Sequence, residues 1–220
     1  MIKTGSEAKR LRNELHTKGE AYPEPSRIRI HRAISWLTRA EQEDADPDAR
    51  FVFLWIAFNA AYAKEFGHEE SARAQLGSFF GRLVAIDTGR RLAALMLDQF
   101  SGPVRTLIAN KFVFEPFWKA LRDHDGSGQW EVQFQASSKV ATRAVLDGKI
   151  AVVLSVVFDR LYVLRNQLVH GGATWNSSAN RAQVKDGANI LSAVIPVVIE
   201  LMLDHPEEDF GEILYPVVSR

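Results

Sequence analysis

Apolar residues recur at helical spacing through most of the chain. Ile30 and the apolar residues three, four and seven positions after it occupy one face of an α-helix. Similar spacing, with capping residues at the ends, predicts helices over about 6–18, 27–42, 49–66, 70–84, 88–99, 138–146, 149–170 and 179–204, and shorter ones beginning at Pro103 and Pro116. No segment alternates apolar and polar residues for long enough to build a sheet, so the predicted fold class is all-α.

Three of the predicted helices are apolar over most of their surface, and we expect them to be buried. Helix 49–66 has an uninterrupted apolar centre, and helix 149–170 is apolar except at a few positions. The last helix contains the uncharged run 190–199, in which Pro196 predicts a kink. Because Glu200 ends this run, the run is too short to span a membrane.

The polar ends of the chain set the expected domain boundaries. A helix capped by Ser6 and a proline-containing stretch around Pro23 predict an N-terminal polar appendage and linker over 1–25. All the apolar helices lie in 26–204, so a single helical domain is expected there, followed by a C-terminal tail over 205–220.

One internal segment is rich in turn-forming residues. Gly126 and Gly128 lie in the stretch 123–138, ahead of the helix predicted to begin at its end. Trp130 and Phe134 in the same stretch are expected to pin it to the core. The sequence therefore predicts a helical bundle with extra short helices and a long internal loop, either a lid or an insertion.

Composition narrows the classes of function. Lysine plus arginine and aspartate plus glutamate number 27 each, so the chain lacks the strong positive field of a dedicated duplex-DNA binder. Basic residues are concentrated in the first forty positions. Among them Arg32 either guides RNA to the site or is an ordinary solvated surface residue. The first residues lack the apolar core of a signal peptide. We expect a cytoplasmic protein that does not enter a membrane.

The sequence lacks the usual signatures of bound metals and cofactors. The chain has no cysteine, which excludes disulfides, thiol nucleophiles and cysteine-bound zinc. Its six histidines show no metal-ligand spacing, and phosphate-loop, nucleophile-elbow and HExxH motifs are absent. No cofactor is therefore expected.

Five polar residues follow one side of the predicted helix 149–170. At about 100° per residue they fall within about 80° of one another; they are Ser155, Asp159, Tyr162, Asn166 and His170. By the same count Arg165 lies about 140° from His170, although its long side chain can reach around the last turn. Since nearly all other positions are apolar, this polar stripe is expected to be a polar line on a buried helix.

These polar residues also have ordinary structural explanations. Helices often end with arginine or histidine in the last turn and glycine after it, so the run 165–172 can serve only to stop a helix. Asn59 follows the apolar centre of helix 49–66. It is either a hydrogen-bonded core amide or a supporting group at a functional site.

The segment 164–171, Leu-Arg-Asn-Gln-Leu-Val-His-Gly, resembles the signature of the HEPN superfamily (higher eukaryote and prokaryote nucleotide-binding). In that signature an arginine, often followed by asparagine, precedes a histidine at a short fixed spacing. The context is similar too, because the motif ends a long apolar helix in an all-helical chain and another long helix follows. A looser resemblance covers about 26–204.

The resemblance implies a helical bundle that forms a homodimer, in which two copies of the motif meet at a cleft. It also implies metal-independent endoribonuclease activity. At the matching positions, His170 would act as general base or acid on a ribose 2′-hydroxyl and Arg165 would stabilise charge on the phosphate. Asn166 would orient one of these groups, and Asn59, Asp159 and Tyr162 are candidate supporting residues.

Two functions are compatible with these features. The first is a HEPN-type ribonuclease of a toxin–antitoxin or defence system, with RNA as substrate and an antitoxin or nucleotidyltransferase as partner. The alternative is a non-catalytic helical module for binding or dimerisation, in which the same motif only ends a helix.

Overall fold

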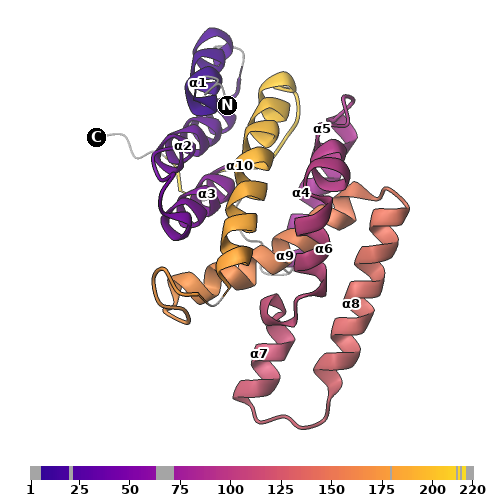
Figure 1. The fold of residues 1–220 in the computed structure, drawn as a ribbon. Coiled ribbons are helices and arrows are strands. Elements are labelled where there is room, and N and C mark those ends of the chain that lie inside the picture. The colour runs from indigo at the N-terminus through magenta and orange to yellow at the C-terminus, as the bar shows by residue number, and fades with distance from the viewer. Residues whose placement is uncertain are drawn as a thin grey trace.

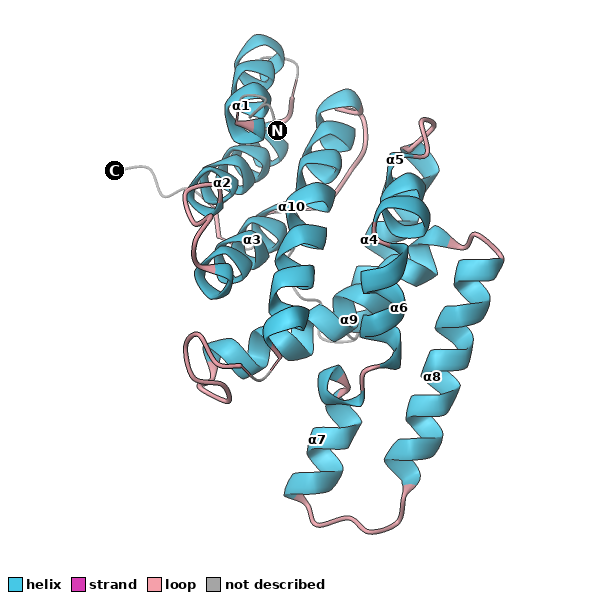
Figure 2. Ribbon diagram, viewed as in Figure 1, coloured by secondary structure: helices cyan, strands magenta, loops and turns pink. Residues whose placement is uncertain are grey.

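A computed structural model describes residues 6–19, 22–62, 72–178, 180–211, 213 and 215–216. The regular elements within this described part are helices (Figures 1 and 2), which confirms the predicted all-α class. They are α1 Glu7–Lys18, α2 Glu24–Ala40, α3 Pro47–Tyr62, α4 Ala72–Ile86, α5 Arg91–Ala93, η2 Ala94–Gln99, α6 Ser101–Ala109, η3 Lys111–Val113, α7 Glu115–Arg122, α8 Gln129–Leu146, α9 Ile150–Val169 and α10 Arg181–Asp204. Of these, η2 is a π-helix and η3 a 3₁₀ turn.

The last helix, α10, lies at the centre of the fold. In Figure 1 it runs between α1, α2 and α3 on one side and α4, α5 and α6 on the other, and it contacts elements of both groups. Its run 190–199 is mostly buried, and Pro196 lies inside the helix, as the sequence predicts. α10 is long and apolar enough to cross a membrane by length and composition, but 67% of its most apolar stretch is buried inside the fold.

An aromatic cluster joins α3, α4 and α9 beside α10. The rings of Phe58 and Phe158 lie 4.5 Å apart, and those of Phe80 and Phe158 lie 4.8 Å apart. Burial of such large side chains stabilises the bundle by about 1.5–3 kcal/mol each. The apolar centres of helices 49–66 and 149–170 therefore form the core, as their composition indicates.

The expected long internal loop over 123–138 is wrong. α8 already begins at Gln129, so only a short turn joins it to α7, and the two helices form a hairpin that extends from the body of the fold (Figures 1 and 2). Trp130 and Phe134 do pin this segment, but from within a helix. Their rings lie 5.0 Å from Phe117 and 5.3 Å from Phe114.

Both ends of the described chain are fastened to the bundle. α1 is capped by Ser6, whose hydroxyl accepts from the Lys9 amide, but it is not a loose appendage, because Leu11 and Leu15 are buried against the core. In the segment after α10, Phe210 is buried, and the Gly211 carbonyl accepts a hydrogen bond of 2.8 Å from the buried Arg29.

Two helix boundaries differ from the prediction. α2 begins at Glu24, with Pro25 in its first turn, rather than after a cap at Ser26. α3 begins at Pro47 rather than at residue 49, and Asp46 caps it, since its Oδ1 accepts from the amides of Asp48 and Ala49. The predicted end of this helix near residue 66 lies outside the described residues.

Candidate functional site

The motif lies where α9 ends and turns into the loop before α10. His170 is the residue after the last helical turn, and its amide donates to the Asn166 carbonyl at 3.0 Å. Gly171 has φ of +69°, a conformation that glycine adopts without strain. At Gly172 a Cβ would lie 3.3 Å from the Gln167 carbonyl oxygen, which again favours glycine. The two glycines therefore fold the chain back tightly behind His170.

Arg165 and Asn166 are in direct contact. Arg165 Nη1 donates to Asn166 Oδ1 at 2.9 Å, and both side chains are half-buried. Although Arg165 points away from His170 by helical count, its guanidinium thus reaches the polar stripe one turn before His170. Among the described residues no carboxylate lies within 4.0 Å of this guanidinium.

His170 is exposed to solvent. In the part of the chain that the structure describes, its imidazole has no hydrogen-bond partner and no ion pair. An exposed imidazole therefore lies at the same helix end as an arginine that forms no ion pair with any described carboxylate. Such a pair can move a proton and stabilise an anion.

The loop after His170 is fixed to the start of α3. Trp175 Nε1 donates to Asp46 Oδ2 at 2.9 Å, and the Asn176 amide donates to Asp48 Oδ2 at 2.9 Å. Arg181 Nη2 donates to the same Asp48 oxygen at 2.9 Å. The hydrogen bond from Trp175 and those from backbone amides hold the pKa of Asp46 below its usual range. These contacts make the loop a defined surface beside the motif.

Gln167, in the middle of the motif, has a structural role. Its Nε2 donates to the Phe112 carbonyl at 2.7 Å, and its Oε1 accepts from Asn180 Nδ2 at 3.0 Å. It thereby joins η3, α9 and the loop. Gln167, Asp48 and Arg181 line a small pocket of about 10 Å³, which has room for about one water molecule. A ligand of nucleotide size therefore has to bind on the outer surface of this region.

The polar stripe lies on a largely buried helix, as expected, but it is not itself enclosed in the core. Its residues are half-buried or exposed, so they follow the more accessible side of α9. Ser155 lies next to α4, where a Cβ on Gly77 would be 3.9 Å from its Oγ. Tyr162 is 44% exposed, with its ring 6.1 Å from that of Trp55. Asp159 is half-buried. Only Asn166 and His170 of the stripe lie at the motif itself.

Asn59 does not lie at the motif. The ring of the preceding residue, Phe58, contacts that of Phe158, which lies 12 positions before His170, or about 18 Å along the helix axis. The Asn59 side chain is half-buried rather than enclosed in the core. Arg32 is also remote from the motif. The loop after His170 is tied to Asp48, at the start of α3. Arg29, on α2 close to Arg32, instead contacts the carbonyl of Ala61, at the other end of α3.

The buried polar residue of α9 is Arg160, which the helical count does not single out. It is fully buried, its guanidinium carbon lies 4.5 Å from the Phe114 ring centroid and 5.7 Å from that of Phe134, and Nη2 donates to Ser137 at 3.0 Å. A cation over aromatic faces is attracted by the ring quadrupole. Arg160 therefore holds the α7–α8 hairpin on α9. In the sequence, the position of this arginine within an apolar helix could have indicated that it is buried and has a structural role.

Comparisons of the chain with models of protein families, with curated proteins and with solved structures find no match. Among the described residues no group of three or more histidine or acidic side chains is arranged to hold a metal ion. The chemistry of the site is therefore argued from its own residues.

Proposed function

We propose that this protein is a metal-independent endoribonuclease of the HEPN type, acting in the cytoplasm as a homodimer within a defence or toxin–antitoxin system. One observation carries the proposal: an exposed imidazole and an arginine share the end of α9, and among the described residues the first has no partner and the second no carboxylate partner. The resemblance of the segment 164–171 to the HEPN signature supplies the substrate class.

In the proposed reaction His170 removes the proton from a ribose 2′-hydroxyl, whose oxygen then attacks the adjacent phosphorus. The bond from phosphorus to the 5′-oxygen breaks, a proton passes to that oxygen, and a 2′,3′-cyclic phosphate remains. Arg165 stabilises the added negative charge on the phosphate oxygens. Asn166 holds the guanidinium by accepting its hydrogen bond. In a dimer the second His170 would supply the acid.

Cleavage of RNA in the presence of a metal chelator tests this proposal. We expect His170→Ala to lower the cleavage rate by about 10²- to 10⁴-fold, because the proton-transfer group is lost. Arg165→Ala should lower it by about 10²- to 10³-fold through loss of charge stabilisation. Variants purified identically also control for contaminating nucleases. Equal cleavage by the wild type and His170→Ala would show that the assignment is wrong.

A second candidate is the non-catalytic binding or dimerisation module. It is favoured by the structural roles of Gln167, Gly171 and Gly172, which hold the loop whether or not RNA is cut. Under this alternative His170→Ala changes the free energy of unfolding by no more than about 1 kcal/mol, as is typical of a charge at a helix end. It would then alter no RNA cleavage.

A further inference from the structure

Two aromatic side chains beside the motif are exposed. Trp175, in the loop after His170, is 74% exposed, and Phe112, in η3, is 44% exposed. Aromatic residues dominate binding energetics because of the large area that they bury on contact. Exposed rings beside a candidate site are therefore candidates for contacts with the ligand.

The Trp175 ring is held by a hydrogen bond, and the Phe112 ring by its fixed backbone and by the ring of Phe117, 5.5 Å away. The Phe112 carbonyl accepts from the side chain of Gln167, which fixes η3 against the motif. The indole N–H of Trp175 is bound to Asp46, so the one polar atom of this side chain is satisfied while most of the ring remains in contact with solvent. Ligand contacts on rings that are already fixed lose little conformational entropy on binding.

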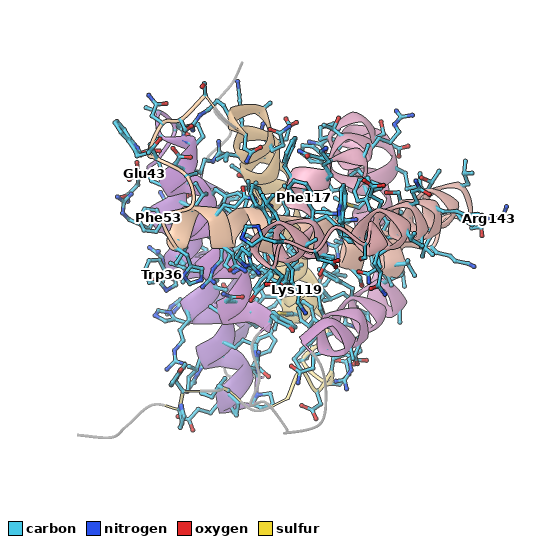
Figure 3. All side chains as sticks on the ribbon, turned by 90° about the horizontal axis from the view of Figure 1, so that it is seen from below. Trp36, Glu43, Phe53, Phe117, Lys119 and Arg143 are labelled. Carbon is cyan, nitrogen blue, oxygen red and sulfur yellow. The ribbon has the colours of Figure 1, made fainter. Side chains whose placement is uncertain are left out.

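The two rings come from different elements near the end of α9. Phe112 lies in η3, which contacts α9, whereas Trp175 is tied to the start of α3. Trp175 follows His170 by five residues, so their Cα atoms are at most about 17 Å apart. A short oligonucleotide can span that distance. The aromatic surface of η3 continues to Phe117 of α7, which lies near the centre of the view in Figure 3 and whose ring centroid is 5.5 Å from that of Phe112.

The charges around these rings favour an anionic ligand. Lys111 Nζ lies 5.4 Å from the centroid of Phe112, and Arg165 has no carboxylate partner among the described residues. The acidic groups near Trp175 are already engaged, since Asp46 caps α3 and Asp48 is paired with Arg181 at 2.9 Å. Cations interleaved with exposed rings are typical of sites that bind single-stranded nucleic acid.

We propose that the end of α9 binds single-stranded RNA, with unpaired bases stacked on Phe112 and Trp175 while the backbone passes Arg165 and His170. This inference deepens the proposed ribonuclease function and rests on it for the identity of the ligand. Bases in a duplex are already stacked on their neighbours and do not offer their faces to these rings. The surface therefore discriminates against double-stranded RNA.

Binding is measured in the full-length His170→Ala background, which separates affinity from cleavage. The probe is a fluorescein-labelled, mixed-sequence oligoribonucleotide, alone or annealed to its complement, and the readout is fluorescence anisotropy. We expect Trp175→Ala and Phe112→Ala each to raise the Kd for the single strand by about 5- to 150-fold. Trp175→Phe should retain most of the affinity, because it keeps a stacking ring.

Tyr215→Ala is the matched control. Tyr215 is also 74% exposed, but it lies in the segment after α10, where its carbonyl accepts from Arg32. It should leave the Kd unchanged. Circular dichroism of each variant checks that the helices are intact, and Trp175→Ala removes a side chain with too little buried surface to unfold the chain.

The proposal is overturned if the parent does not bind the single strand, if it binds the duplex equally well, or if the two alanine variants bind like the parent. A cleavage assay of the wild type keeps the two hypotheses separate. Cleavage with unaltered binding by the variants refutes the stacking surface alone. Weakened binding by the variants without any wild-type cleavage refutes the nuclease and leaves a site for single-stranded RNA.

Discussion

At the scale of single residues, Asp46 links the loop after His170 to the start of α3. One carboxylate oxygen accepts from the amides of Asp48 and Ala49, and the other accepts from the Trp175 indole. These donors stabilise the ionised carboxylate, and the Trp175 hydrogen bond is the largest cause of its lowered pKa. The position of the exposed indole therefore depends on the ionisation of one side chain.

This coupling predicts a specific dependence of stability on pH. Because the pKa of Asp46 is lower in the folded chain than in the unfolded chain, its contribution is complete above about pH 4 and is lost as the pH falls through the lowered pKa. Asp46→Asn should therefore lower the urea midpoint at neutral pH, and the difference from the wild type should shrink on acidification.

Asp123→Asn is the control for this measurement, because Asp123 is exposed in the turn between α7 and α8. A constant difference between the wild type and Asp46→Asn from neutral to acidic pH would contradict the linkage. Trp175 fluorescence, compared with that of Trp175→Phe, reports whether the indole leaves its position over the same pH range.

At the scale of helices, the packing of α10 depends on Gly187. A Cβ at this position would lie 2.8 Å from Phe51 Cε2 and 2.9 Å from Leu161 Cδ2, closer than real atoms approach. The missing side chain thus allows α10 to approach α3 and α9 at the same point. Helices that meet this closely exclude even a methyl group unless their neighbours move.

Gly187→Ala should therefore destabilise the fold by about 1–3 kcal/mol, as overpacking does, although alanine is the better helix former. The matched substitution is Gly81→Ala in α4, where a Cβ would meet nothing within 4 Å. This control should be neutral or stabilise by up to about 1 kcal/mol. Urea denaturation of both variants measures the contrast, and equal effects would show that the close approach is not limiting.

Helix periodicity and caps were sufficient to predict most helices, because α9 and α10 must bury apolar faces and end at recognisable residues. They failed for α8, whose first turns follow two glycines and present few apolar residues to the core. Trp130 and Phe134 instead pack on α7, a contact that local sequence patterns do not reveal. α2 likewise begins at Glu24, ahead of Ser26, since Pro25 is tolerated in a first helical turn.

The candidate site was predicted in part. The end of α9 follows from a helix that stops at two glycines, whereas the exposed position of His170 was not predicted, because its stripe was expected on a buried helix. The Arg165 contact with Asn166 depends on the side-chain conformation, which a helical count does not include. The anchoring of the loop joins Asn176 to Asp48, 128 positions earlier in the chain. Such long-range pairs are set by the packing of α3 against α10 and leave no local trace.

At the scale of the whole molecule, the proposed reaction depends on two chains, because one His170 would act as base and the other as acid. We therefore expect the active species to sediment at twice the chain mass of 24.7 kDa. Specific ribonuclease activity should also fall on dilution below the dissociation constant of the dimer. Constant specific activity for a sedimenting monomer would refute a shared site.

The central place of α10 also bears on how the chain folds during synthesis. This helix is synthesised after the helices that it covers, yet it contacts α1, α2, α3, α4 and α9. Until α10 has been synthesised, Phe51 on α3 and Leu161 on α9 lack the helix that packs on them at Gly187. The nascent chain therefore exposes apolar helix faces, which are prone to aggregate, until α10 has been synthesised. The core can therefore close only after α10 has been synthesised, and a chain cut short before Arg181 would lack the helix that joins the two groups of helices.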